Sequence, residues 1–182
     1  MADGLELLLL DIDGVLVDAR PSYDASSIES VSLYLGRVLG FIGSSETTIT
    51  MDHIVSLKRS GGFNNDWHLC FAVLRRVLAR APADLELPDL NAADGLETAL
   101  PLLQHVGPAS GLTCDTLLAA ADLESFGQEL SAAGGGVDAV DAVCGPRHAG
   151  LVLYGDDLAH DDLVTRIFQE VYLGSEQLRV HH

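Results

Sequence analysis

The most constraining feature of the sequence is an apolar run that ends in two aspartates. Residues 7–17 read LLLLDIDGVLV, so Asp11 and Asp13 follow four leucines and precede Gly14. A short, mainly apolar segment of this kind, residues 5–10, is typical of a strand that is covered on both faces in a parallel sheet. Because side chains at positions i and i+2 of an extended segment point to the same side, we expect the two carboxylates to converge.

Two converging carboxylates repel each other unless a cation or a shared proton compensates. Mg²⁺ would do so, because it prefers oxygen ligands and commonly binds one or two carboxylates together with phosphate oxygens. The carboxyl end of a parallel strand is where open sheets place their ligands, and Gly14 leaves room for one. The sequence therefore predicts a Mg²⁺ site at Asp11 and Asp13. The alternative is that the pair only caps a turn.

The charge balance limits the partners of the chain. Its 182 residues include 27 acidic and 10 basic ones, a formal net charge of −17, which disfavours nucleic acids and anionic membranes as partners. No stretch approaches the roughly 18 apolar residues of a membrane span, and no export signal is evident. Three widely spaced cysteines, Cys70, Cys114 and Cys144, indicate reduced thiols. We expect a cytoplasmic protein.

Most of the remaining sequence has the apolar periodicity of helices. Pro21 opens one helical stretch, Thr50 is expected to cap another, and Gly174 is expected to end the last. The residues 150–157, GLVLYGDD, are either a second short strand or an extended lead-in to that last helix. Further helices are predicted over residues 66–81, 94–106 and 112–133, with a linker before residue 94.

The stretch LLLLDIDGVLVD resembles the first motif of the haloacid dehalogenase-like (HAD) hydrolase superfamily, hhhhDxDGxxxD. The resemblance implies an α/β fold class, a HAD-like Rossmannoid core with a predominantly α-helical cap. It also implies that Asp11 attacks the substrate phosphorus and that Asp13 protonates the leaving group and later activates water, with Mg²⁺ neutralising the phosphoryl oxygens. An aspartate at position 13 argues against a true dehalogenase, because those enzymes lack it.

Two further stretches, residues 56–69 and residues 166–174, resemble the cap of an uncharacterised subgroup of these hydrolases through their GGFNNDW and FQEVYLG sequences. This implies that Lys58, Asn64 and Asn65 reach over the active site and bind a small phosphorylated metabolite. The competing interpretation is that the asparagines and Asp66 are ordinary turn formers and helix caps.

The resemblance divides the chain into three parts. Residues 1–20 would form the first core strand and the DxDG loop, residues 21–176 a helical cap-like region, and residues 177–182 a tail. Trp67 is expected to belong to the core rather than to bind a ligand, because it lies on the apolar face of its helix.

Other elements of the superfamily are not recognisable. No Ser or Thr follows a second strand, and Lys58, the single lysine, lies in the cap-like region. Residues 151–162, LVLYGDDLAHDD, are similar to the late acidic motif of the family, in which case Asp156 or Asp157, supported by Asp161, would complete the metal site. We favour the alternative that these acids lead into the last cap helix, with His160 facing solvent.

The leading hypothesis is thus a cytoplasmic, Mg²⁺-dependent phosphatase of the HAD type, with most of the sheet domain not recognisable in this chain. The alternative is a non-catalytic helical module, derived from such a cap, that binds a partner or forms a homodimer.

Overall fold

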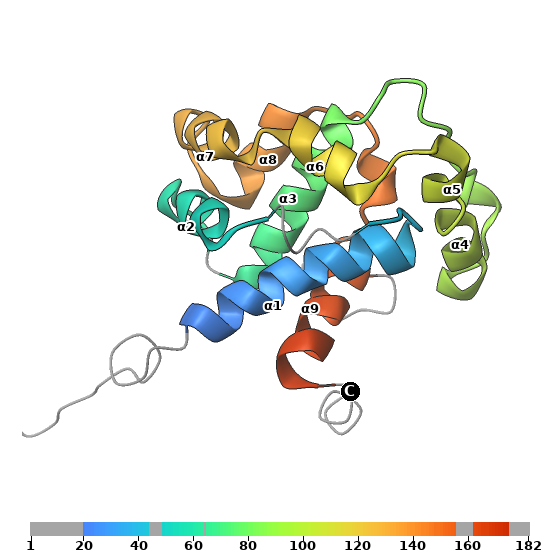
Figure 1. Ribbon diagram of the computed structural model, residues 1–182, viewed down its shortest axis with the longest axis horizontal. Helices are drawn as coiled ribbons and strands as arrows, with labels where there is room; N and C mark the ends of the chain where they lie inside the picture. Colours follow the sequence, from blue (N-terminus) through green and yellow to red (C-terminus); the bar gives the residue numbers. More distant parts are fainter. Residues whose placement is uncertain (1–19, 44–48, 64, 156–161, 175–182) are drawn as a thin grey trace, which may run out of the picture.

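The computed structural model describes residues 20–43, 49–63, 65–155 and 162–174, and these residues form a helical body (Figure 1). Short π-helical and 3₁₀ turns, η1 to η3, occur at Tyr34–Val38, Leu90–Ala92 and Ala149–Leu151. The α-helices of the described part are α1 (Arg20–Leu33), α2 (Met51–Arg59), α3 (Asp66–Arg80), α4 (Leu96–Leu103), α5 (Val106–Ser110), α6 (Cys114–Ala121), α7 (Leu123–Ala132), α8 (Gly136–Cys144) and α9 (Leu163–Leu173).

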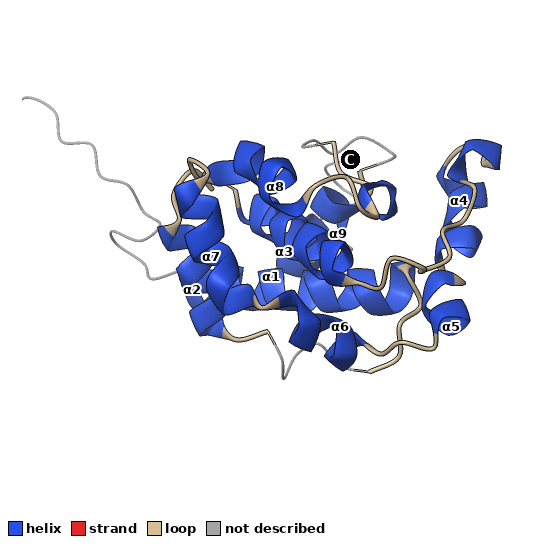
Figure 2. Ribbon diagram, turned by 90° about the horizontal axis from the view of Figure 1, so that it is seen from above, coloured by secondary structure: helices blue, strands red, loops and turns tan. Residues whose placement is uncertain are grey.

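The predicted α/β fold is wrong for this body. Within the described residues, the β pairing consists of one isolated parallel bridge between Ile42 and Thr113, and Figure 2 shows helices and loops throughout. The predicted first strand, residues 5–10, lies outside the described residues. The described part of the second candidate, residues 150–155, is not a strand, because its start belongs to the η3 turn and residues 152–155 continue without regular structure toward α9, as in the alternative interpretation of this segment.

The segment that follows η3 makes backbone hydrogen bonds without a partner strand. The Tyr34 hydroxyl donates to the Leu151 carbonyl at 2.9 Å and accepts from the Leu153 N–H at 2.8 Å. The Leu153 carbonyl accepts in turn from Leu163 N–H, at the start of α9, at 3.0 Å. Since a buried backbone group needs only one good partner, the apolar run has no need of a sheet. Burial also raises the pKa of Tyr34, which keeps the hydroxyl protonated as a donor.

Several helix boundaries confirm the sequence predictions. The Thr50 side chain accepts from His53 N–H, and the His53 ring accepts from Thr50 N–H, so the two ends of this capping box satisfy each other at the start of α2. Helix α9 starts at the N-cap Asp162, whose carboxylate accepts from Thr165 N–H at 2.9 Å, and it ends before Gly174. The stretch predicted as a helix over 112–133 is instead broken at Asp122, which has φ +48°.

Helix α3 is the centre of the body. Every residue from His68 to Leu78 is buried, and the helix packs against α1, α6, α8 and α9 (Figure 1). A helix that is buried around its whole circumference needs neighbours on all sides. The two ends of α3, Asp66 and Arg80, lie outside this buried stretch, and each reaches the surface at a different place.

The three cysteines of the chain lie among the described residues. All three cysteines, Cys70, Cys114 and Cys144, are free. Burial raises the pKa of Cys70 to about 12, so this thiol is an inert core group. Among the described helices, none combines the length and the apolar character that crossing a membrane would require.

Candidate functional site

Of the residues predicted to form the site, the structure describes Lys58 and Asn65. Asp11, Asp13 and Asn64 lie outside the described residues, as do the acids at positions 156–161 that were candidates for a completed metal site. The described site is therefore built around the end of α2, the start of α3, and the helices that pack beside them.

Lys58 lies between two carboxylates. From the last turn of α2, its Nζ contacts Asp24 Oδ1 at 2.6 Å and Asp66 Oδ1 at 2.7 Å. Asp24 belongs to α1 and its side chain is only 7% exposed, whereas Asp66 is the first residue of α3. This Lys58 cluster, comprising Lys58, Asp24 and Asp66, therefore joins three helices at one point.

The charges of the cluster determine the protonation of Lys58. Burial alone would lower the pKa of Lys58, but the hydrogen bonds and charges of Asp24 and Asp66 outweigh it and raise the pKa above its ordinary value. One ammonium faces two carboxylates, so the cluster carries one net negative charge at neutral pH. The ammonium has three N–H donors, and two of them serve the carboxylates. Its direct contact with a substrate stays a prediction.

The turn that leads into α3 is held by a second glycine turn. Gly136 N–H, at the start of α8, donates to the Gly61 carbonyl at 2.7 Å. Gly62 has φ +78°, and a β-carbon at this position would lie 2.7 Å from Gly136 Cα. Packing thus requires glycine at position 62, whereas Gly61 is favoured by its positive φ of +85° alone, and this turn leads directly into Asn65 and Asp66.

A pocket of about 350 Å³ opens beside the Lys58 cluster, and Asp66 belongs to both. Its walls are aromatic: Tyr23 and Tyr172 stack with ring centroids 4.5 Å apart, and Trp67 meets Phe168 edge-on at 6.1 Å. Its polar residues are Asp66, which carries a carboxylate, Asn65 and Gln169, which carry amides, and the two tyrosines, which carry hydroxyls. The pocket is lined from α1, from the start of α3 and from α9, by Tyr23, Asn65, Asp66, Trp67, Phe168, Gln169 and Tyr172.

Asn65 lines this pocket and occupies the N-cap position of α3. Its backbone has the extended conformation of a cap, but its side chain makes no capping hydrogen bond. The turn-former interpretation therefore accounts for its backbone and leaves its amide group available to a ligand. Trp67 is half-buried and packs against the core while it also lines the pocket, so it combines the core role that was expected with a wall of the site.

The predicted site residues did not include four of the lining residues, namely Tyr23, Phe168, Gln169 and Tyr172. A signal was present for the last, because Phe168 and Tyr172 are four residues apart and share one face of α9. Tyr23 follows the predicted catalytic segment without any local pattern that marks it. Only the packing of α1 against α9 brings it to the pocket.

The described residues do not supply a metal centre themselves. Among them, no group of three or more His, Cys, Asp or Glu side chains is placed to hold an ion, and Asp24 and Asp66 both face Lys58. The predicted Mg²⁺ ligands, Asp11 and Asp13, are outside this part of the chain. Comparisons of the chain with protein-family models, with curated proteins and with solved structures give no match.

Proposed function

We propose that the chain is a Mg²⁺-dependent phosphatase-type hydrolase whose helical body binds the organic part of a small phosphorylated metabolite. The observation that carries the proposal is the convergence of three distant stretches on one pocket: Tyr23, Asn65–Trp67 and Phe168–Tyr172. The second and third belong to the two stretches that resemble a HAD cap. The first comes ten residues after Asp13 in the sequence.

The proposed chemistry rests on the aspartate pair. A carboxylate oxygen of Asp11 attacks phosphorus, the bond from phosphorus to the leaving oxygen breaks, and Asp13 gives that oxygen its proton. Asp13 then takes a proton from water, which cleaves the aspartyl-phosphate and restores Asp11. Two carboxylates are a donor set that suits Mg²⁺, which would neutralise charge on the phosphoryl oxygens when bound.

The pocket favours a particular kind of leaving group. Because the Lys58 cluster is net negative, the aromatic pocket does not suit the phosphate itself. The amides of Asn65 and Gln169 suit hydroxyl or amine groups, while the rings of Tyr23 and Tyr172 offer an apolar face. We therefore propose a substrate whose organic part is neutral or cationic, carries hydroxyl or amine groups, and has a flat apolar side.

Release of inorganic phosphate from para-nitrophenyl phosphate and from a panel of phosphomonoesters tests the chemistry. We expect activity that requires Mg²⁺, that Asp11→Asn abolishes and that Asp13→Asn lowers by about 10²–10⁴-fold. Asp84→Asn, an exposed site with the same charge change, is the matched control and should behave as the wild type. Wild-type rates in Asp11→Asn would overturn the proposal.

The role of the pocket is tested separately with Asn65→Ala. Loss of one hydrogen bond to the leaving group should raise KM by about five- to tenfold for an active phosphomonoester, with little change in kcat. The exposed Asn91→Ala is the control. An unchanged KM across the whole panel would remove Asn65 from the binding site.

The second candidate function is a non-catalytic helical module that binds a partner or dimerises. It is favoured by one observation: the described residues have a continuous hydrophobic core of their own. Absence of Mg²⁺-dependent hydrolysis, combined with sedimentation of the chain as a dimer, would support this candidate instead.

We also propose a cytoplasmic location. The support is that all three cysteines are free, and that two of them, Cys70 and Cys114, are buried as thiols. Free thiols persist in reducing compartments.

A further inference from the structure

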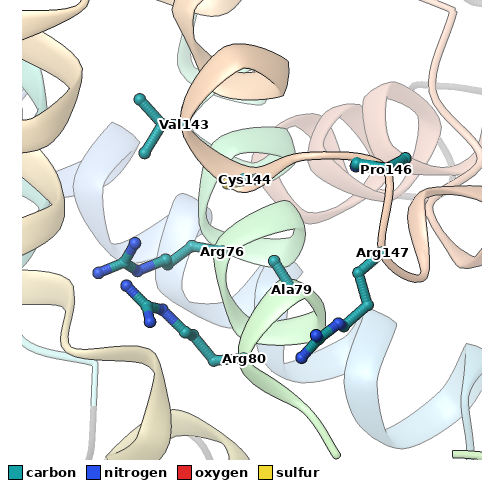
Figure 3. Close-up of a pocket in the computed structure, with 7 residues that line it drawn as sticks. All are labelled: Arg76, Ala79, Arg80, Val143, Cys144, Pro146 and Arg147. Carbon is teal, nitrogen blue, oxygen red and sulfur yellow. The ribbon is translucent and has the colours of Figure 1, made fainter. Parts of the chain in front are cut away.

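A second pocket, of about 550 Å³, gathers three of the nine arginines of this acidic chain (Figure 3). Arg76 and Arg80 come from α3, and Arg147 comes from the loop after α8. With a net charge of −17, the chain has few cations to place, so their concentration at one pocket requires an explanation. The rest of the lining is Ala79, Val143, Cys144 and Pro146.

Arg76 has a structural role in the fold. Its guanidinium is buried and donates to the Ala121 carbonyl at 2.6 Å and to both carboxylate oxygens of Glu129 at 2.7 and 2.9 Å. These contacts use the donors of Arg76 to hold α6 and α7 against α3. Arg76 therefore adds charge to the pocket and has little hydrogen-bonding capacity left for a ligand.

Arg80 and Arg147 have no comparable structural role among the described residues. The Arg80 side chain is 50% exposed, and its contact with Glu129 is a distant 3.9 Å to a carboxylate that Arg76 already occupies. Arg147 is exposed, and its side chain has no hydrogen bond or ion pair among the described residues. In Figure 3 the Arg80 guanidinium lies beside that of Arg76, while Arg147 extends from its loop toward Ala79.

The charge balance of this pocket is positive. Three guanidinium groups line it, and the nearby acids of the described part are Glu129, Asp141, which is paired with Arg75, and, at the exposed rim, Asp122, whose pKa is lowered mainly by hydrogen bonds from Ser125 and further by Arg76 and Arg80. The planar forks of Arg80 and Arg147 match the geometry of a phosphate group, to which guanidinium can donate two parallel hydrogen bonds.

Part of the pocket lining is apolar. Burial raises the pKa of Cys144 to about 11, so this residue is a neutral thiol rather than a nucleophile. It continues the surface formed by Val143 and Pro146. A ligand with an organic part could contact this wall while its anionic group faces the arginines.

We propose that Arg80 and Arg147 bind the phosphate group of a small organic phosphate, whose organic part contacts Val143, Cys144 and Pro146. This phosphate pocket is distinct from the aromatic pocket. Asp66 and Arg80 are the two ends of α3, and 14 residues of helix separate them by about 21 Å. The phosphate pocket does not depend on the hydrolase chemistry of Asp11 and Asp13.

An NMR titration of the full chain tests this assignment. Inorganic phosphate is added to ¹⁵N-labelled, Mg²⁺-free protein in EDTA, against sodium chloride at equal ionic strength. We expect saturable shifts of the Ala79, Cys144 and Arg147 amide signals. The absence of saturable shifts at these amides would overturn the proposal, whatever the outcome of the hydrolase assays.

The arginines themselves are tested with the Arg80→Gln/Arg147→Gln double variant, which should bind phosphate at least about tenfold more weakly. Arg37→Gln, a change at an exposed arginine elsewhere, should bind as the wild type does. Circular dichroism and thermal unfolding establish that both variants fold. Equal affinity of the double variant and the wild type would overturn the roles of Arg80 and Arg147.

The apolar wall is tested by comparing phenyl phosphate with inorganic phosphate under the same conditions. Contact with Val143 and Pro146 should make phenyl phosphate the tighter ligand, with additional shifts at these side chains. Equal affinities would overturn the assignment of the wall to an organic part and would leave a site for phosphate alone.

Discussion

Arg75 and Arg76 are neighbours in α3, yet each holds the end of a different helix. Arg75 donates to the Gly145 carbonyl at the end of α8, and Arg76 donates to the Ala121 carbonyl at the end of α6. Consecutive residues of a helix point about 100° apart, so the two side chains reach different neighbours. The last carbonyls of a helix lack partners within it, and the buried guanidinium groups supply them.

Removal of Arg76 should therefore destabilise the whole body. In Arg76→Met the Ala121 carbonyl and the Glu129 carboxylate lose a buried, charged donor, and we expect the free energy of unfolding to fall by about 2–4 kcal/mol. Urea denaturation at neutral pH measures the change. Arg37→Met, at an exposed arginine, should stay within about 0.5 kcal/mol of the wild type. Equal losses in both variants would contradict the capping role.

The pair of Arg76 and Glu129 should also make stability depend on acid pH. The hydrogen bond from Arg76 is the main reason why the pKa of Glu129 lies below its ordinary value of 4.5. A carboxyl whose pKa is lowered by folding stabilises the protein above its unfolded pKa, and this contribution disappears as the pH falls through the folded pKa. The stability difference between wild type and Glu129→Gln should be full at about pH 7 and shrink below pH 4.5.

Urea denaturation at a series of pH values measures that difference. Glu97→Gln, at an exposed glutamate in the first turn of α4, is the matched control and should show no comparable trend. The prediction would be contradicted if the difference in the free energy of unfolding between wild type and Glu129→Gln stayed constant down to about pH 3, where carboxyl groups are largely protonated.

Lys58→Met should destabilise the protein, because it leaves two acids together without a cation. Without the ammonium, Asp24 and Asp66 face each other with no cation, and Asp24 is buried. We expect a loss of about 1–3 kcal/mol in the free energy of unfolding, and we expect Asp24→Asn to restore part of it in the double variant. The neighbouring Arg59→Met is the control, because Arg59 is exposed and has no ion pair within the described residues. Additive effects of Lys58→Met and Asp24→Asn would rule out their coupling.

The contact between the two glycine turns gives a prediction with an internal control. Gly61 and Gly62 both have positive φ, but only Gly62 approaches Gly136 closely enough for a β-carbon to meet its backbone, at 2.7 Å. Gly61→Ala should cost about 1–2 kcal/mol through backbone strain alone, and Gly62→Ala should cost clearly more. Thermal unfolding compares them. Equal melting temperatures would mean that the turns do not pack as described.

The sequence by itself determined those helices whose ends are local. The start of α2 at Thr50 and the end of α9 at Gly174 could be predicted because capping residues and apolar periodicity lie within a few positions of each other. Asn65 was assigned to the site because its turn resembles part of a HAD cap, and its role in binding stays a prediction. The sequence left open whether residues 150–155 form a strand or an extended lead-in to α9, because an apolar run gives no information about its hydrogen-bond partners.

Only the tertiary structure decided those partners and the composition of the site. The run after η3 pairs with the Tyr34 hydroxyl and with the start of α9 rather than with a strand. Tyr23 and Tyr172, 149 positions apart in the sequence, meet because α1 packs on α9. Contacts of this kind depend on which faces of distant helices are buried together, and that is set by the packing of the whole core rather than by any local pattern.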